Sequence, residues 1–135
     1  ITNGDLVTDL DFRKLIQHHR RSRCVLTVAF CKQKIKSQYG LLEIAKGSRL
    51  SGFHEKPTKT MCVNMGVYVC EPEILGYVPD GMAFGADDLM HALLHDKKPV
   101  SVYQHRGLWL DIGALPDLQV AQDLFDEHRH LITGD

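Results

Sequence analysis

The sequence predicts an α/β domain, in which a mixed β-sheet is flanked by helices. Short apolar segments rich in β-branched residues alternate with segments whose apolar residues recur at helical spacing. Of the 135 residues, 44% are hydrophobic and 24% are charged, which is the composition of an ordinary folded protein. We therefore expect a single domain over residues 1–135 with its own core.

Three full-length helices are predicted. The first can be capped by Asp9 or Asp11 and has arginines in its last turn, where the helix dipole favours positive charge. The second spans residues 86–95 and begins with two aspartates, and the third spans residues 116–130. A shorter helix is predicted to open at Pro72, because proline is favoured in a first turn.

Strands are predicted between these helices. The segments are residues 1–5, 24–31, 39–45, 49–55, 63–70 and 99–105. Residues 24–31 are apolar throughout, which is typical of a strand covered on both faces in the middle of a sheet. The residues that follow them are expected to form a basic loop. Lys46-Gly47-Ser48 predicts a hairpin between the third and fourth segments.

Charge and cysteine usage indicate a cytoplasmic protein without a nucleic-acid partner. The net charge is −1, both signs are spread along the chain, and the one dense basic run, His18 to Arg23, falls at a predicted helix end. The four cysteines lie in or beside predicted strands, so we expect reduced core thiols. The sequence shows neither a leader peptide nor the ~18 consecutive apolar residues of a membrane span.

The histidines are interpreted as structural. His91 and His95 have the helical spacing of zinc proteases, but no glutamate follows the first of them. His18-His19 and the pair at positions 128 and 130 lie near predicted helix ends. A nucleophilic Cys/His pair stays open, although no spacing favours one.

Three short stretches together carry a family resemblance. They are Asn3-Gly4-Asp5, Glu55-Lys56-Pro57 and Trp109-Leu110-Asp111-Ile112-Gly113, with Tyr39-Gly40 and Val63-Asn64-Met65-Gly66 in matching order between them. In this combination the chain resembles sugar-phosphate nucleotidylyltransferases, such as those acting on glucose 1-phosphate or mannose 1-phosphate. The resemblance covers almost the whole chain. It implies a partial doubly wound mixed sheet, a truncated form of the nucleotide-diphospho-sugar transferase-like fold.

The resemblance implies an activity and a metal. Members of the family join a sugar 1-phosphate to a nucleoside triphosphate and release pyrophosphate. Such a reaction brings anions together, so catalysis depends on alignment and on cations that offset the negative charge. By resemblance, Asp5 and Asp111 are magnesium ligands, and Asp111 is also catalytic. Magnesium commonly takes one or two carboxylates and leaves its other positions to phosphates and water.

The resemblance also implies a sugar pocket. Lys56 would be a catalytic cation facing the sugar phosphate, and Glu55 would accept hydrogen bonds from sugar hydroxyls. The remaining substrate-binding positions implied by these motifs are Tyr39, Gly40, Asn64, Gly66 and Trp109.

Each of these residues also has a structural interpretation. Asp5 and Asp111 can terminate strands, and Glu55 with Lys56 can form a solvated pair. The glycines at positions 40 and 66 can mark bulges, and a tryptophan is more typical of a core than of a ligand contact.

The chain departs from the family pattern in one respect. The glycine-rich loop, the arginine after it and the later Pro-Lys pair that cradle the nucleotide phosphates do not occur in these 135 residues. The chain is therefore expected to be the sugar- and metal-binding half, inactive alone, with nucleotide bound only if a complementary half is supplied. The alternative is a non-catalytic truncated or mobile-element relic that self-associates and binds a sugar phosphate or a protein partner. In either case the uncovered sheet edge and apolar faces predict a homodimer.

Overall fold

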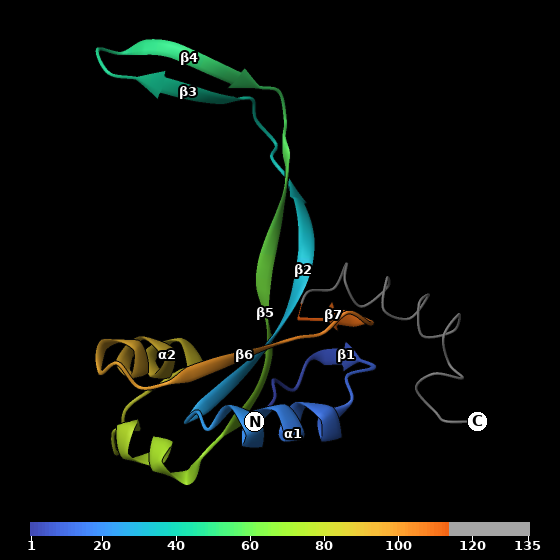
Figure 1. Cartoon of the computed structure of the whole chain (residues 1–135), viewed down its shortest axis with the longest axis vertical. Helices are drawn as coiled ribbons and strands as arrows, with labels where there is room; N and C mark the ends of the chain where they lie inside the picture. Colours follow the sequence, from blue (N-terminus) through green and yellow to red (C-terminus); the bar gives the residue numbers. More distant parts are fainter. Residues whose placement is uncertain (114–135) are drawn as a thin grey trace, which may run out of the picture. The chain divides into compact units, whose positions relative to one another are not determined.

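The computed structural model describes residues 1–113 (Figure 1). Its elements are β1 (Leu6–Thr8), α1 (Phe12–Ser22), β2 (Leu26–Lys36), β3 (Leu41–Ala45), β4 (Arg49–His54), β5 (Thr58–Cys70), the 3₁₀ helix η1 (Pro72–Tyr77), α2 (Ala86–His95), β6 (Val100–Gln104) and β7 (Trp109–Asp111). The helix predicted at residues 116–130 lies outside the described residues.

The chain divides into two compact units, which we describe separately. Of the described residues, 1–31 and 64–113 belong to the first unit and 32–63 to the second. The expectation that residues 1–135 form one domain stays a prediction.

A three-stranded sheet in the order β5-β2-β6 forms the centre of the first unit. Strand β6 is parallel to β2, with Leu26 opposite Val100. The start of β2 lies against the end of β5, because Glu71 N donates to Val25 O at 2.9 Å. The sheet is therefore mixed, with the apolar strand in the middle, and the predicted α/β class is confirmed.

Two strands are longer than predicted, one short strand, β1, was missed, and β7 ends at Asp111, where a strand end was expected. Strand β2 runs on to Lys36, so the residues predicted as a basic loop are a strand, and β5 begins at Thr58 instead of residue 63. Both added segments are mostly exposed, so they lack the apolar signal that marks a buried strand. The short strands β1 and β7 pair with each other in a separate two-stranded sheet.

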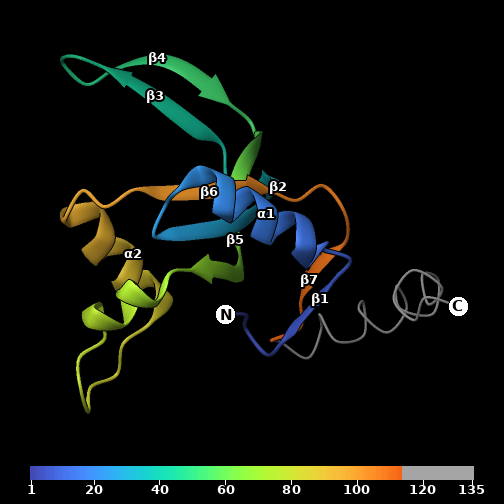
Figure 2. The same ribbon diagram turned by 60° about the horizontal axis from the view of Figure 1, so that its bottom comes forward.

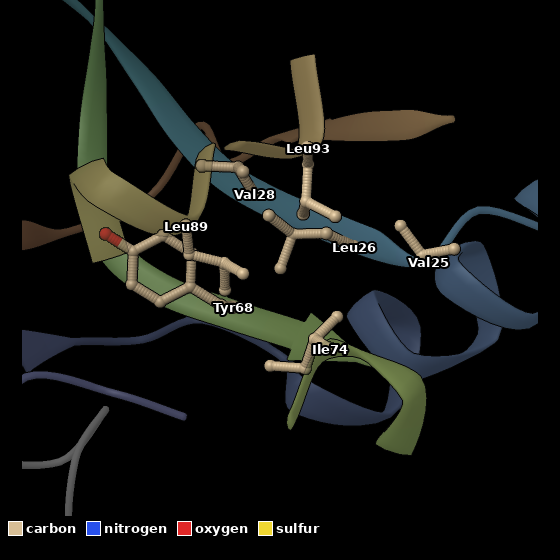
Figure 3. Packing of buried hydrophobic residues seen from close by; sticks show 7 residues of the cluster. All are labelled: Val25, Leu26, Val28, Tyr68, Ile74, Leu89 and Leu93. Atoms are coloured by element: carbon tan, nitrogen blue, oxygen red, sulfur yellow. The ribbon is translucent and has the colours of Figure 1, made fainter. Parts of the chain in front are cut away.

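The core of the first unit lies between the sheet, η1 and α2. Its buried cluster consists of Val25, Leu26, Val28, Tyr68, Ile74, Leu89 and Leu93 (Figure 3). Helix α2 has the predicted bounds and contributes Leu89 and Leu93, whereas Leu94 of the predicted apolar stripe is 64% exposed. The carboxylate of Asp88 accepts a hydrogen bond from Gly85 N at 2.9 Å and so caps the helix start.

Helix α1 is capped by one of the two predicted aspartates. Asp11 accepts hydrogen bonds from the backbone N–H groups of Arg13 and Lys14 at 3.0 and 3.1 Å. The hydrogen bond from Lys14 N is the main cause that lowers the pKa of Asp11. The helix ends at Arg23, which adopts the left-handed conformation with φ 53°.

His19 links α1 to the sheet. It is 3% exposed, and its Nδ1 lies 2.8 Å from Thr27 Oγ1 while its Nε2 lies 3.2 Å from Glu71 Oε1. This arrangement supports the structural interpretation of His19. His91 and His95 are exposed on α2, and residues 1–113 contain no group of three metal-ligating side chains. The pair at positions 128 and 130 lies outside the described residues.

The four cysteines are free thiols, but they are not all in the core. Cys31 is buried, and burial raises the pKa of its thiol. Cys62 is exposed, so its predicted core position is wrong, because it lies in the exposed part of β5. Among the described helices, none has the length and apolar character needed to cross a membrane.

The second unit contains the predicted hairpin. Strands β3 and β4 pair antiparallel, from Leu41 opposite His54 to Ala45 opposite Arg49. Gly47 and Ser48 in the turn have φ values of 76° and 58°, and the left-handed region suits glycine at such a position.

Replacing Thr27 by valine is expected to destabilise the protein by about 1–3 kcal/mol, because it leaves the buried Nδ1 of His19 without its partner. Valine retains the shape and strand preference of threonine, so the lost hydrogen bond dominates. Urea unfolding followed by circular dichroism measures the difference. The exposed Thr60→Val variant is the control, and equal stability of both variants would contradict the assigned role.

Candidate functional site

Two of the family motifs are brought together by the pairing of β1 with β7. The strands are antiparallel, with Leu6 opposite Asp111, and they lie side by side in both views (Figures 1 and 2). The ladder continues beyond the strand end, because Ile112 N donates to Asp5 O at 2.9 Å. Asp5 and Asp111, far apart in sequence, therefore stand on neighbouring backbone segments.

The carboxylates of these two aspartates converge beside Gly113. A Cβ at position 113 would lie 3.1 Å from Asp5 Oδ2 and 3.2 Å from Asp111 Oδ1. Asp111 Oδ1 also accepts a hydrogen bond from Gly113 N at 3.1 Å. Both aspartates are exposed. A side chain at position 113 would crowd both oxygens, so glycine keeps the space between them open.

Among the described residues, this pair is the donor set best suited to a magnesium ion. Magnesium favours oxygen ligands and is commonly bound by one or two carboxylates together with substrate phosphates and water. A structural zinc site would need four protein ligands and a catalytic one three. No cluster of three His, Cys, Asp or Glu side chains exists in residues 1–113. The residues present therefore fit magnesium better than zinc.

Asn3 and Asn64 both shape the backbone around Gly66. Asn3 N donates to Gly66 O at 2.9 Å, and a Cβ on Gly66 would lie 2.6 Å from Asn3 Nδ2. Gly66 also has φ 72°, which disfavours any other residue. Asn64 Oδ1 accepts from Gly66 N at 3.0 Å, and its Nδ2 donates to the Tyr68 hydroxyl at 2.7 Å. The Asn64 amide is thus already engaged within the fold.

Asn3 was not among the residues predicted for the site. The signal was present in the Asn-Gly-Asp motif, which was interpreted only for its aspartate. A glycine with positive φ packed against a side-chain amide cannot be recognised from sequence spacing, because the contact depends on how two distant segments pair.

Trp109 connects β7 to β5. Its indole Nε1 donates to Met65 O at 3.0 Å, and the residue is half-buried opposite Thr8. The polar end of the ring is therefore used internally, which favours the structural interpretation of this tryptophan. Together with the Asn3–Gly66 and Asp5–Ile112 hydrogen bonds, this contact joins three of the matching stretches within the first unit.

The other predicted site residues belong to the second unit. A Cβ on Gly40 would lie 2.8 Å from the ring of Phe53 and 2.9 Å from Glu55 Oε2, so the glycine allows close packing at this point. Tyr39 is 76% exposed. Its backbone N–H and C=O both bond to the hydroxyl of Ser37, at 3.1 and 2.8 Å. Tyr39, Gly40 and Glu55 are therefore neighbours.

Lys56 has an unusual backbone conformation. Its φ is 41°, and the following Pro57 disfavours helical conformations in the residue before it. The side chain is exposed, and no ion pair joins it to Glu55 in the described part of the chain. Uncommon backbone conformations cluster at functional sites, where the surrounding structure holds them. Both interpretations of Glu55 and Lys56, as sugar-side groups and as solvated charges, stay predictions.

Comparisons with known proteins identify the family of this chain. The family model described as nucleotidyl transferase matches residues 1–127. A putative mannose-1-phosphate guanyltransferase of Sulfolobus acidocaldarius is 37% identical over 119 residues, which are 87% of this chain and 32% of that protein. A UTP--glucose-1-phosphate uridylyltransferase of Synechocystis sp. is 29% identical over 84% of this chain and 31% of its own length.

Solved structures show the same fold. HddC from Yersinia pseudotuberculosis superposes with a TM-score of 0.61 at 24% identity, covering 92% of this chain and 53% of that one. A putative glucose-1-phosphate thymidylyltransferase from Bacillus anthracis, solved in complex with a sucrose, gives a TM-score of 0.63 at 18% identity, covering 91% and 52%. The predicted fold is thereby confirmed.

The chain spans about a third of the length of these curated relatives and about half of the solved chains. The family model covers nearly every residue of this chain. The stretches around Asn3, Gly66 and Trp109, which contact one another in the first unit, are among the motifs on which the resemblance rests. This protein belongs to the nucleotidyl transferase family.

Proposed function

We propose that this chain supplies the sugar-binding and metal-binding half of a sugar-1-phosphate nucleotidylyltransferase that serves nucleotide-sugar biosynthesis. The observation that carries the proposal is the convergence of Asp5 and Asp111 beside Gly113. The curated relatives named for transfer to mannose 1-phosphate and glucose 1-phosphate support the substrate class. A cytoplasmic location is part of the proposal, and the four free thiols favour it.

In this proposal the two aspartates hold magnesium. The ion, when bound, offsets the negative charge that accumulates as two phosphate groups approach each other. Asp5 and Asp111 supply carboxylate oxygens from adjacent backbone segments, so neither has to move far to reach a shared position. Asp111 is oriented by the N–H of Gly113, which fixes one of its oxygens.

The second unit supplies the sugar-side groups in this proposal. Lys56 offers a cation to the sugar phosphate, and Glu55 accepts hydrogen bonds from sugar hydroxyls. Tyr39 is exposed and adjacent in sequence to Gly40, which itself packs against Phe53 and Glu55. The glycine therefore acts by positioning Glu55. Asn64, Gly66 and Trp109, which belong to the first unit, are further substrate-binding positions in this proposal, and the asparagine amide and the indole nitrogen are held by protein groups.

Nucleotide transfer would require a nucleotide-binding half, in a longer polypeptide or on another chain. The family's glycine-rich phosphate loop does not occur in these 135 residues, and phosphate cradles of this kind depend on glycine-rich backbone N–H groups. We therefore propose that the chain alone binds a sugar 1-phosphate but does not turn over.

A second candidate function is self-association without catalysis. It is favoured by an apolar groove of about 280 Å³ beside the start of the chain, lined by Ile1, Thr2, Phe12, Ile16, Tyr68, Val69 and Cys70. Phe12 is 49% exposed and Ile16 is 38% exposed on α1. Exposed apolar surface of this kind invites another chain, so a homodimer is proposed under either function.

The Asp111→Asn variant is expected to lose the magnesium-dependent part of sugar-phosphate binding, because the amide removes one of two negative ligands. Isothermal titration with glucose 1-phosphate and with mannose 1-phosphate, each with and without magnesium, measures this part. Asp80→Asn, an exposed carboxylate elsewhere in the first unit, is the matched control.

Gly113→Ala is a second variant to be measured in the same titration. Its methyl group would crowd both carboxylate oxygens, whereas Gly4→Ala meets nothing within 4 Å. We expect weaker magnesium dependence for the first and no change for the second. Wild-type magnesium dependence in Asp111→Asn would contradict the proposed metal site.

The isolated chain is expected to release no pyrophosphate from nucleoside triphosphates with either sugar phosphate, in the presence or absence of magnesium. A coupled pyrophosphate assay measures this, with a full-length member of the family as the positive control. Magnesium-dependent pyrophosphate release by the chain alone, abolished in Asp111→Asn, would show that the proposed need for a nucleotide-binding half is wrong.

A further inference from the structure

The hairpin of β3 and β4 presents an uncovered apolar face. Leu42 lies opposite Phe53, and Ile44 lies opposite Leu50, so all four side chains are on the same side of the hairpin. They are 59%, 56%, 71% and 64% exposed, respectively. Within the second unit, these large apolar residues form a continuous surface across both strands.

The opposite face of the hairpin carries polar side chains that bond to each other. His54 Nε2 lies at hydrogen-bond distance from Glu43 Oε1 there, at 3.0 Å, and Glu43 packs over Gly52. The hairpin is therefore amphipathic, with one face suited to water and one to a partner. A two-stranded hairpin is only marginally stable in water without an apolar surface to cover it.

Charge restricts the partner of the apolar face. Residues 32–63 contain seven Lys or Arg residues and only two Glu residues. This segment therefore departs from the even spread of both charges that was expected along the chain. The basic residues are Lys32, Lys34, Lys36, Lys46, Arg49, Lys56 and Lys59. A surface that combines apolar side chains with negative charge would complement this unit.

The first unit carries such a surface. An apolar groove of about 210 Å³ is lined by Ile1, Leu26, Tyr68, Ile74, Leu75, Val78, Phe84, Gly85, Ala86 and Leu89. Leu75 is 69% exposed and Val78 is 45% exposed. The segment 71–96, which provides η1 and α2 around this groove, contains six Asp or Glu residues and no Lys or Arg, and one of the six, Glu73, pairs with the following Lys98 at 3.4 Å.

We propose that the apolar face of the β3–β4 hairpin docks into this groove on a second copy of the chain, and that the second copy docks in the same way on the first. A two-fold arrangement makes the contact twice and closes the dimer. Packing two hairpins face to face would instead bring two strongly basic units together, which like-charge repulsion opposes. This inference builds on the proposed self-association and identifies its elements, and it does not depend on nucleotidyl transfer.

The first test removes the apolar face. In the Ile44→Thr/Leu50→Thr variant, β-branched threonine keeps the strand preference while the apolar surface shrinks. We expect the wild-type chain to be a dimer at micromolar concentration by light scattering after size exclusion. The dissociation constant of this variant should be at least about tenfold higher. Val102→Thr replaces a 59% exposed strand residue outside both surfaces and should leave the dimer unchanged.

The second test reverses the charges. The Lys46→Glu chain and the Glu73→Lys/Asp80→Lys chain should each dimerise at least about tenfold more weakly than the wild type, because each places like charges on both sides of the contact. Mixing the two should restore a dimer, since opposite charges then meet at both contacts. Circular dichroism checks that each variant is folded, and omitting sugar, nucleotide and magnesium keeps the test independent of the enzymatic proposal.

Three outcomes would overturn the inference. A wild-type chain that stays monomeric at these concentrations excludes the dimer. A dimer that survives Ile44→Thr/Leu50→Thr excludes the hairpin as its contact. The third outcome is that the hairpin variants are monomeric whereas the Glu73→Lys/Asp80→Lys chain still dimerises. The dimer contact would then lie between two hairpins.

Discussion

The pairing of β1 with β7 is the constraint on which the candidate site depends. It holds two carboxylates from opposite ends of the described chain at one position, although like charges repel each other there. The arrangement is tolerable because both groups are exposed to water and because Asp111 is held by a backbone N–H. A cation at that position would reduce the remaining repulsion between the two carboxylates. The pairing of β1 with β7 is therefore the structural basis of the proposed metal site.

Most of the first unit's fold could be predicted from the sequence, because the buried apolar residues recur at the spacing of a helix or a strand. The bounds of α2 and the central position of β2 followed from apolar spacing and capping residues, and the cap at Asp11 was one of the two aspartates that the sequence allowed. The exposed halves of β2 and β5 were missed, since backbone pairing alone holds them and leaves no periodic apolar signal. The short strand β1 was missed for a similar reason, because three residues are too few to show a period.

The site was predicted only in part. Motif order predicted Asp5 and Asp111 as metal ligands, which stays a prediction, and the open space at Gly113 between their carboxylates appears only once the segments are paired. Asn64 and Trp109 were expected at the sugar, yet their polar groups are bonded to Tyr68, Gly66 and Met65. Sequence spacing cannot reveal such bonds, because the partner of Trp109 lies on a distant strand and the partners of Asn64 depend on the local conformation of β5.

The most direct test of the account is a titration of the chain with manganese, which shares the oxygen preference of magnesium and broadens the NMR signals of nearby nuclei. If one ion is shared, the amide signals of Asp5, Asp111 and Gly113 should broaden together at the same low manganese concentration, and excess magnesium should restore them. Broadening at only one of the two aspartates, or at neither, would contradict a shared metal position.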